Sequence, residues 1–343
     1  MSVPTDGLAL ATRGLHKTFG PRVALAGLDL SVPPGIVYGF LGPNGAGKTT
    51  TMRLLTGLIH ADAGTIELLG RAFRRGDRRR LFEVGALIET PSFYPYLSGR
   101  ENLRALAAAG APVAGARIEE LLELLGLADR ARDRVQDYSM GMKQRLGIAA
   151  ALLSDPRLLL LDEPANGLDP AGIVAMRETL RYLASSGKTV FVSSHILGEV
   201  QQLADRIGII AAGRLIREGP IDELLQSEGI VRARVSPGEV EPAVTVLRRL
   251  VPAEAVSRVP GEEGWLAIRI EPARSAEVNR ALAEAGVFVS ALEAGNDLES
   301  LFLELTGAET AAGRVGAFFG QAAPPVPAGW GQDADPDHGG DTG

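Results

Sequence analysis

The chain has 343 residues, of which 45% are hydrophobic and 22% are charged, a composition typical of a globular protein long enough for two domains. Its net charge of -7 argues against a broad nucleic-acid-binding surface, so we expect no nucleic-acid partner. The absence of cysteine excludes disulfides, thiolate zinc sites and a cysteine nucleophile and fits a cytoplasmic location, and no apolar run approaches the ~18 residues of a membrane-spanning helix.

The first hundred residues predict short strands around a glycine-rich loop. Two segments of strand character are separated by the turn Phe19-Gly20-Pro21, and later apolar runs end at glycine, proline or charged residues. Helical spacing begins after the loop and breaks at Gly57. We expect a helix over 49–58 and strands over 8–15, 23–30, 36–41, 64–69 and 84–88.

The loop itself, Gly42-Pro43-Asn44-Gly45-Ala46-Gly47-Lys48-Thr49-Thr50, fits the phosphate-binding pattern G-x-x-x-x-G-K-[ST]. Glycines let the backbone point its N–H groups inward at phosphate oxygens, and the following helix adds partial positive charge. Lys48 can reach the outer phosphates, and the Thr49 hydroxyl can bind a magnesium ion. The sequence therefore predicts a nucleotide site.

The middle of the chain predicts an all-helical insert, about residues 99–154, followed by alternating strands and helices. Ser98 and Ser139 are suitable caps for two of the insert's helices, expected over 101–109, 118–125 and 140–153. Beyond the insert we expect strands over 158–161, 189–192 and 207–211 and helices over 171–185 and 196–204. Apolar strands alternating with helices indicate a parallel sheet covered on both faces.

Two carboxylates follow the apolar strand 158–161. Asp162 and Glu163 lie where it ends, the edge at which open α/β sheets bind ligands. Because neighbouring strand residues point to opposite faces, we expect different roles for them. Asp162 suits the magnesium shell, and Glu163 suits a general base for a water molecule.

Residues 228–307 predict a separate small domain without phosphate chemistry. The element order βαββαβ suggests a ferredoxin-like α+β fold. Its strands are expected over 231–235, 255–259, 265–270 and 287–292, and its helices over 240–250 and 275–285. A last helix is expected over 298–305, and residues 308–343, rich in Gly, Pro, Ala and Asp, are expected to be disordered.

Five segments taken together resemble the ATP-binding-cassette (ABC) family, over about residues 7–227. In chain order they are the phosphate loop, Tyr138–Arg145, the run Leu-Leu-Leu-Leu-Asp-Glu-Pro, Asn166–Pro170 and Val192–His195. The resemblance implies an α/β P-loop NTPase (RecA-like) core with an N-terminal antiparallel β subdomain and a helical insert. It further implies an ATPase subunit that uses ATP and Mg²⁺ and lies on the inner face of the cell membrane. Such subunits pair with a transmembrane permease and close as dimers, here expected as a homodimer, over two ATP molecules.

The resemblance also assigns residues. Ser139 and Gly141 would contact the γ-phosphate bound to the other subunit, Glu163 matches the catalytic base, and His195 matches the switch histidine. Phe19 matches the aromatic residue that stacks on adenine, although a core aromatic at this position is the alternative.

Two departures from the family pattern stand out. Glu89 occupies the position of a usual glutamine, and a role for it in the metal shell is a hypothesis. The usual Leu-Ser-Gly-Gly-Gln appears as Tyr138-Ser139-Met140-Gly141-Met142, so Met140 could limit how closely the backbone approaches phosphate. We still expect hydrolysis, because Glu163 and His195 are both present.

Residues 89–102 and 298–306 look like the subgroup that exports drugs, peptide antibiotics or natural products, and we expect the permease groove near residues 89–101. One alternative is a soluble ABC-type ATPase acting in translation or DNA repair. Such chains usually carry two cassettes or coiled-coil arms, whereas this chain has one phosphate loop and no sustained heptads. A second alternative is a regulatory module without turnover.

Overall fold

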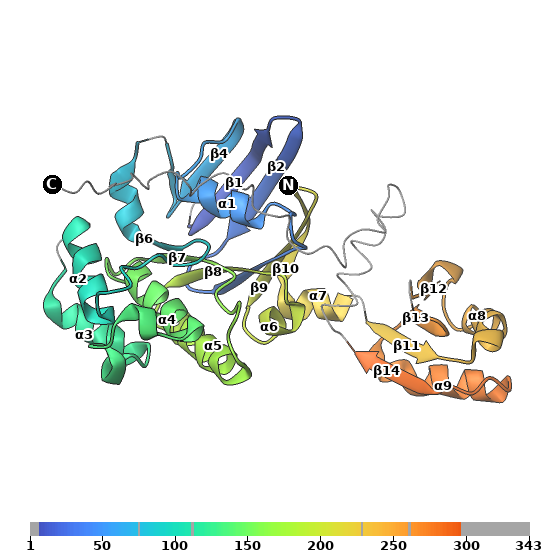
Figure 1. Cartoon of the computed structure of the whole chain (residues 1–343). Helices are drawn as coiled ribbons and strands as arrows, with labels where there is room; N and C mark the ends of the chain where they lie inside the picture. Colours follow the sequence, from blue (N-terminus) through green and yellow to red (C-terminus); the bar gives the residue numbers. More distant parts are fainter. Residues whose placement is uncertain (1–6, 75, 111–112, 228, 260–261, 296–343) are drawn as a thin grey trace, which may run out of the picture. The chain divides into compact units, whose positions relative to one another are not determined.

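The computed structural model describes residues 7–74, 76–110, 113–227, 229–259 and 262–295 (Figure 1). A six-stranded sheet forms the centre of the larger part, in the order β10-β9-β3-β8-β7-β6. Its strands pair in parallel except β10, which is antiparallel to β9. The strands are β3 (Val37–Leu41), β6 (Val84–Leu87), β7 (Leu158–Asp162), β8 (Thr189–Ser194), β9 (Arg206–Ala211) and β10 (Arg214–Pro220).

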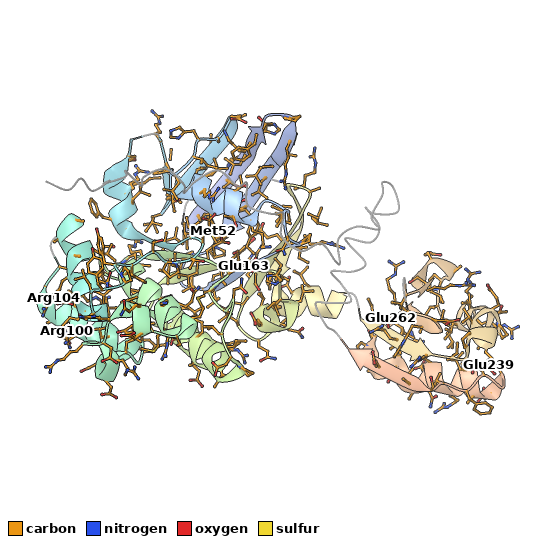
Figure 2. All side chains as sticks on the ribbon, in the orientation of Figure 1. Met52, Arg100, Arg104, Glu163, Glu239 and Glu262 are labelled. Atoms are coloured by element: carbon orange, nitrogen blue, oxygen red, sulfur yellow. The ribbon has the colours of Figure 1, made fainter. Side chains whose placement is uncertain are left out.

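Both faces of this sheet are covered, which explains why β3 and β7 are buried at every position. On one face, Val37 and Leu41 pack in a core with residues of the helical insert and of α5 (Pro170–Ser185) and α6 (Leu197–Gln201). On the other face, Tyr38 and Phe40 pack with α1 (Lys48–Leu55), whose Met52 is fully buried (Figure 2). Successive side chains of these strands therefore still point to opposite faces of the sheet, but the side chains on both faces are apolar.

The second core also contains a four-stranded antiparallel sheet, in the order β2-β1-β4-β5. Strands β1 and β2 run longer than expected, since their pairing extends to Phe19 and Arg22 on either side of the turn. This confirms the predicted antiparallel β subdomain. Its strands are β1 (Leu10–Phe19), β2 (Arg22–Val32), β4 (Ala63–Leu68) and β5 (Arg71–Ala72).

The helical insert consists of α2 (Gly99–Ala109), α3 (Gly115–Leu124) and α4 (Met140–Ala151). Helix α2 begins with a capping box, in which the Ser98 hydroxyl accepts from the Glu101 N–H while the Glu101 carboxylate accepts from the Ser98 N–H. Ser139 caps α4 in the same way, by accepting from the Met142 N–H. The predicted caps of these two helices are confirmed.

Residues 229–295 contain a further four-stranded sheet in the order β12-β13-β11-β14, antiparallel throughout. With two helices between its strands it has the expected ferredoxin-like order, and its core is formed by apolar residues of the sheet and of both helices. The elements are β11 (Ile230–Arg234), α8 (Val240–Leu247), β12 (Val256–Arg258), β13 (Trp265–Arg269), α9 (Ser275–Glu284) and β14 (Ala291–Gly295).

Several elements differ from the expectation. The strand predicted over 287–292 is shifted to β14: Val287 is buried in the core but precedes the strand, and pairing with β11 begins at Ala291. Strands β5 and β10 and helix α7 (Ile221–Ser227) were not predicted, since β5 is short and exposed and β10 is charged. Helix α1 ends earlier than expected, before Gly57 at φ +70°.

The helix and disordered tail expected over 298–343 lie outside the described residues. The described residues also include six short 3-10 helices, at 78–83, 128–130, 135–137, 237–239, 253–255 and 272–274. Within the part of the chain that the structure describes, no helix is both long and apolar enough to cross a bilayer.

Candidate functional site

The phosphate loop connects β3 to α1 and needs its glycines. Gly45 and Gly47 have φ values of +80° and +113°, in a region where side chains are strained. Gly42 is closely packed, since a Cβ there would lie 2.5 Å from the Ile210 carbonyl oxygen. The loop also closes on itself, because the Ala46 N–H donates to the Pro43 carbonyl at 3.1 Å. These constraints shape a backbone turn in front of the α1 N-terminus, where anions bind favourably.

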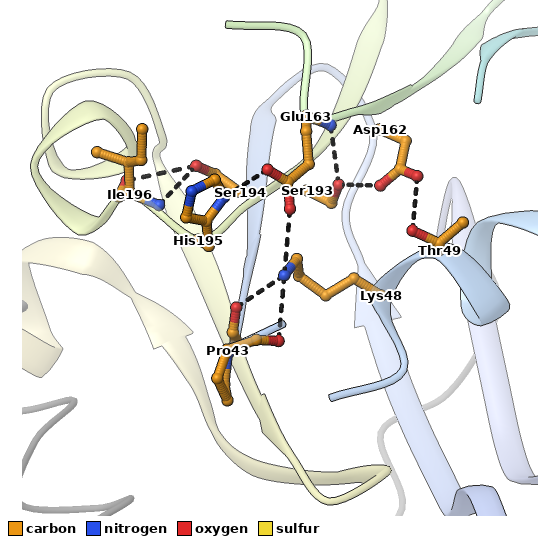
Figure 3. A network of polar contacts seen from close by, with 10 residues as sticks. Pro43, Lys48, Thr49, Asp162, Glu163, Ser193, Ser194, His195 and Ile196 are labelled. Atoms are coloured by element: carbon orange, nitrogen blue, oxygen red, sulfur yellow. Dashed lines mark hydrogen bonds and ion pairs between the residues drawn. The ribbon is translucent and has the colours of Figure 1, made fainter. Parts of the chain in front are cut away.

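Lys48 extends from the first residue of α1 back across this turn (Figure 3). Its ammonium group donates to the carbonyl oxygens of Gly42 at 2.8 Å and Pro43 at 3.3 Å. The same nitrogen lies 3.2 Å from Oε1 of Glu163, and the lysine side chain is only 5% exposed. The positive charge is therefore held at one point by the backbone and by a carboxylate from the turn after β7.

Thr49 and Asp162 form a pair of oxygen ligands beside the lysine. The Thr49 hydroxyl donates to Oδ2 of Asp162 at 2.8 Å, and the Ser193 hydroxyl donates to the other oxygen of Asp162. Hard oxygen donors of this kind suit Mg²⁺, which takes one or two protein ligands and completes its shell with water and substrate phosphates. The chemistry of the residues present therefore fits the ion.

Glu163 does not continue strand β7, which ends at Asp162. We expected strand alternation to separate the two carboxylates, and that reason is wrong. Glu163 has φ +49°, in the left-handed region, so it lies in a turn and not in a strand. Its N–H donates to the Ser193 hydroxyl at 3.0 Å. The turn still gives the carboxylates different surroundings, Thr49 and Ser193 for Asp162 and Lys48 and His195 for Glu163.

His195 is brought to Glu163 by the pairing of β7 with β8, which places Asp162 opposite Ser193. The imidazole Nδ1 contacts Oε2 of Glu163, and the histidine side chain is 37% exposed. The bend after the strand is held by Ser194, whose hydroxyl accepts from the Ile196 N–H at 2.9 Å. A carboxylate held between an ammonium and an imidazole is suited to accept a proton from water.

Ser193 is the residue of this network to which the sequence analysis gave no role. It accepts from the Glu163 N–H and donates to Asp162, so it holds the carboxylate of Asp162 and the backbone of Glu163. A role for Ser193 could have been predicted from the register of two parallel apolar strands, because residues at equivalent strand ends meet at one edge of the sheet.

Two predicted residues lie apart from this network. Glu89, at φ +62°, is ion-paired with Arg53 of α1, and no hydrogen bond or ion pair within the described residues joins it to Thr49 or Asp162. Phe19 is 48% exposed at the end of β1, with the Lys17 ammonium 5.4 Å from its ring centroid. An exposed ring is not a core aromatic, so the alternative interpretation of Phe19 is wrong.

Ser139 and Gly141 stand at the N-terminus of α4, and among the described residues no hydrogen bond or ion pair connects them to the phosphate loop. Met140, between them, is 51% exposed. Asp169 caps α5 by accepting from the Gly172 N–H at 3.0 Å. The structure therefore assembles the phosphate loop, Asp162, Glu163 and His195 within one chain and leaves the Ser139 segment outside that assembly.

Comparison with known proteins gives consistent results. The chain matches the ABC transporter family over residues 25–166. It is 38% identical to the bacitracin transport ATP-binding protein BcrA of Enterococcus faecalis over 301 residues, 87% of this chain and 96% of the relative. It is 39% identical over 316 residues to the daunorubicin resistance ATP-binding protein DrrA3 of Streptomyces coeruleorubidus, with the same shares of the two chains.

A shorter relative and a solved structure are similar to this chain as well. The lantibiotic transport ATP-binding protein SrtF of Streptococcus pyogenes is 43% identical over 213 residues, 62% of this chain and 91% of the relative. Among solved structures, an ATP-binding subunit of an ABC transporter superposes with a TM-score of 0.58 at 30% identity, covering 64% of this chain and 92% of that one.

Proposed function

Because the chain belongs to the ABC transporter family, we propose that it hydrolyses ATP to power export of a drug, peptide antibiotic or other small molecule through a separate membrane permease. The observation that carries this proposal is the contact network of Lys48, Glu163 and His195 beside the Thr49–Asp162 pair. The relatives named for transport of bacitracin and lantibiotics and for daunorubicin resistance support export over a soluble non-transport ATPase.

The residues divide the reaction among them. Backbone N–H groups of the non-proline residues of the loop 42–50 and the Lys48 ammonium hold the phosphates of ATP, and Phe19 stacks on the adenine ring. Thr49 and Asp162 hold Mg²⁺, which neutralises charge on the phosphate oxygens when bound. Glu163 takes the proton from the attacking water, the water oxygen bonds to the γ-phosphorus, and the bond to the bridging oxygen of ADP breaks. His195 orients Glu163 through Nδ1.

A second copy of the chain completes the site. The N-terminus of α4 is suited to bind an anion. Its cap residue Ser139 is exposed and is not directed into this chain's own phosphate loop. In the proposed homodimer, Ser139 and Gly141 of one copy contact the γ-phosphate held by the other. The half-exposed Met140 then lies in the interface rather than in a core.

The permease would dock near residues 89–101, on the inner face of the membrane. Tyr94 and Tyr96 are 54% and 63% exposed there, with ring centroids 6.0 Å apart. The loop that carries them is fixed by Asn102, which accepts from the Tyr94 N–H and donates to three carbonyl groups. Exposed aromatic side chains on a rigid loop are typical of binding surfaces.

Replacing Glu163 by glutamine tests the hydrolytic role. Glu163→Gln keeps the shape of the side chain but cannot accept the proton, so we expect ATP turnover to fall by at least ~100-fold while ATP binding is retained. The measurements are phosphate release and equilibrium nucleotide binding. Glu178→Gln, an exposed carboxylate on α5, is the matched control and should keep the parent rate. A Glu163→Gln protein that hydrolyses ATP at the parent rate would remove Glu163 from this role.

The docking surface has a separate test. Tyr96→Glu places a charge on the exposed aromatic pair, so we expect export by cells producing the chain and its permease to fall while basal ATPase activity of the purified chain stays at the parent level. Tyr182→Phe, on the exposed side of α5, is the control. Unchanged export in the Tyr96 variant would place the permease elsewhere.

A further inference from the structure

A small cavity lies behind the Glu163–His195 pair, between α5, β8 and α6. It has a volume of about 30 Å³, comparable with the volume of one water molecule. Its walls are largely apolar, formed by side chains that include Ile173, Met176, Leu180, Val200 and Leu203. Charged side chains at this cavity therefore lie next to an apolar surface.

Four charged or titratable side chains line this cavity: Glu163, His195, Glu199 and Arg177. The first two belong to the site already described. Glu199 comes from the first turn of α6, four residues after His195, and Arg177 comes from α5. Two carboxylates therefore line the cavity together with His195: Glu163 from the turn after β7 and Glu199 from α6.

Glu199 is partly buried and interacts with all three other groups. Burial raises the pKa of Glu199, the charges of His195 and Arg177 lower it, and Glu163 raises it again. The signs mean that Glu199 attracts His195 and Arg177 and repels Glu163. Glu199 is therefore coupled electrostatically to the imidazole as well as to Glu163.

We propose that Glu199 is a positioning residue for ATP hydrolysis, which acts through His195 by placing a second carboxylate beside the imidazole that Glu163 contacts. The proposal rests on the hydrolytic function proposed above. A neutral imidazole carries one N–H, and Nδ1 already faces Glu163. A second carboxylate that lines the same cavity, four residues further along the chain, constrains how the ring is oriented relative to Glu163. Arg177, on the other side, limits how much negative charge the cavity holds.

The experiment compares steady-state ATP hydrolysis by the full chain and three variants. Glu199→Gln should lower kcat by about tenfold, equivalent to about 1.4 kcal/mol, and leave KM for ATP within about twofold, because the phosphate loop is untouched. Glu199→Asp keeps the charge and should restore most of the rate. Glu178→Gln removes an exposed carboxylate from α5 and should match the parent.

A double-mutant cycle separates positioning from helix stability. In single turnovers with excess protein, Glu199→Gln should change the rate by less than about twofold when His195 is already alanine, because its effect is transmitted by that ring. Parent-like hydrolysis by Glu199→Gln, or no rescue by aspartate, would overturn the proposal, as would an equal loss in both backgrounds. Failure of the hydrolytic function itself is distinguishable, since the parent chain would then release no phosphate.

Discussion

At the scale of single residues, the backbone conformation of Glu163 determines where its carboxylate lies in the site. A non-glycine residue in the left-handed region is strained by about 1–2 kcal/mol. Here the N–H is held by Ser193 and the carboxylate by Lys48 and His195, so several contacts offset the strain. The consequence is a carboxylate whose direction is set by a turn and is therefore independent of the pleat of β7.

Gly47 provides a prediction at this scale. Its φ is +113°, and a Cβ would lie 2.7 Å from Leu25 Cδ2 and 2.8 Å from the Ala24 carbonyl oxygen. Gly47→Ala should therefore displace the loop and weaken ATP binding by at least about tenfold, since positive φ and the clash act together. Isothermal titration with ATP measures this. Gly115→Ala, at an open position with ordinary φ, should bind like the parent, and parent-like binding by Gly47→Ala would contradict the steric argument.

The sequence was sufficient to predict most of these residues because the motifs have fixed spacing, whereas others depend on contacts between distant segments. Lys48, Thr49, Asp162, Glu163 and His195 were predicted and lie together. The partner of Glu89 is Arg53, which no local pattern indicated, and a metal-shell role for Glu89 stays a prediction. The roles of Ser139 and Gly141 stay predictions as well, because they belong to an arrangement of two chains.

At the scale of elements, helix caps were predictable and sheet edges were not. A serine before a helical pattern is a local signal, and Ser98 caps α2 as expected, although the helix begins at Gly99 rather than at residue 101. Strand β10 has charged residues at exposed positions and pairs antiparallel at the edge of a parallel sheet. Its existence depends on tertiary pairing with β9, which periodicity in its own segment does not contain.

The capping box gives a prediction for α2. Ser98→Ala removes the acceptor for the Glu101 N–H, so the free energy of unfolding should fall by about 1 kcal/mol. Urea denaturation followed by circular dichroism gives that value. Ser185→Ala, at the exposed C-terminal end of α5, should change it by less than about 0.5 kcal/mol. Equal effects of the two substitutions would show that the cap contributes nothing specific.

At the scale of the whole molecule, a buried hydrogen-bond network joins the two sheets of the larger part. The Tyr38 hydroxyl of β3 donates to Glu218 of β10 at 2.7 Å, and the same carboxylate oxygen accepts from the Ser31 N–H of β2 at 3.1 Å. Tyr38 is fully buried and its ring stacks on Phe191 at a centroid distance of 5.2 Å. Burial, with the charge of Glu218 second, raises the pKa of Tyr38 well above its usual value.

This network predicts a specific pH dependence. The raised pKa of Tyr38 means that its contribution to stability is fully present below the unfolded pKa of about 10 and is lost as pH rises above it, by up to ~1.4 kcal/mol per pH unit. Tyr38→Phe should lower the free energy of unfolding by about 1–2 kcal/mol at pH 8, and its difference from the parent should shrink between pH 10 and 11. Urea titrations at several pH values measure both effects.

Tyr182→Phe is the control for that series, because Tyr182 is 58% exposed. It should follow the parent at every pH. If the Tyr38 variant kept a constant difference from the parent across pH 8 to 11, the buried hydroxyl would not be the group that titrates.

The contact between Lys48 and Glu163 has one more consequence. The carboxylate occupies, at 3.2 Å, the position beside the ammonium group that the outer phosphates of a nucleotide would take, so Glu163 is an internal competitor for the ligand. A nucleotide whose phosphates offer the lysine more negative charge than one carboxylate displaces it favourably. Each displacement also frees Glu163 to face water. Entry of the substrate thus switches on the base that consumes it, and removing the charge of Glu163 should tighten ATP binding while hydrolysis is lost.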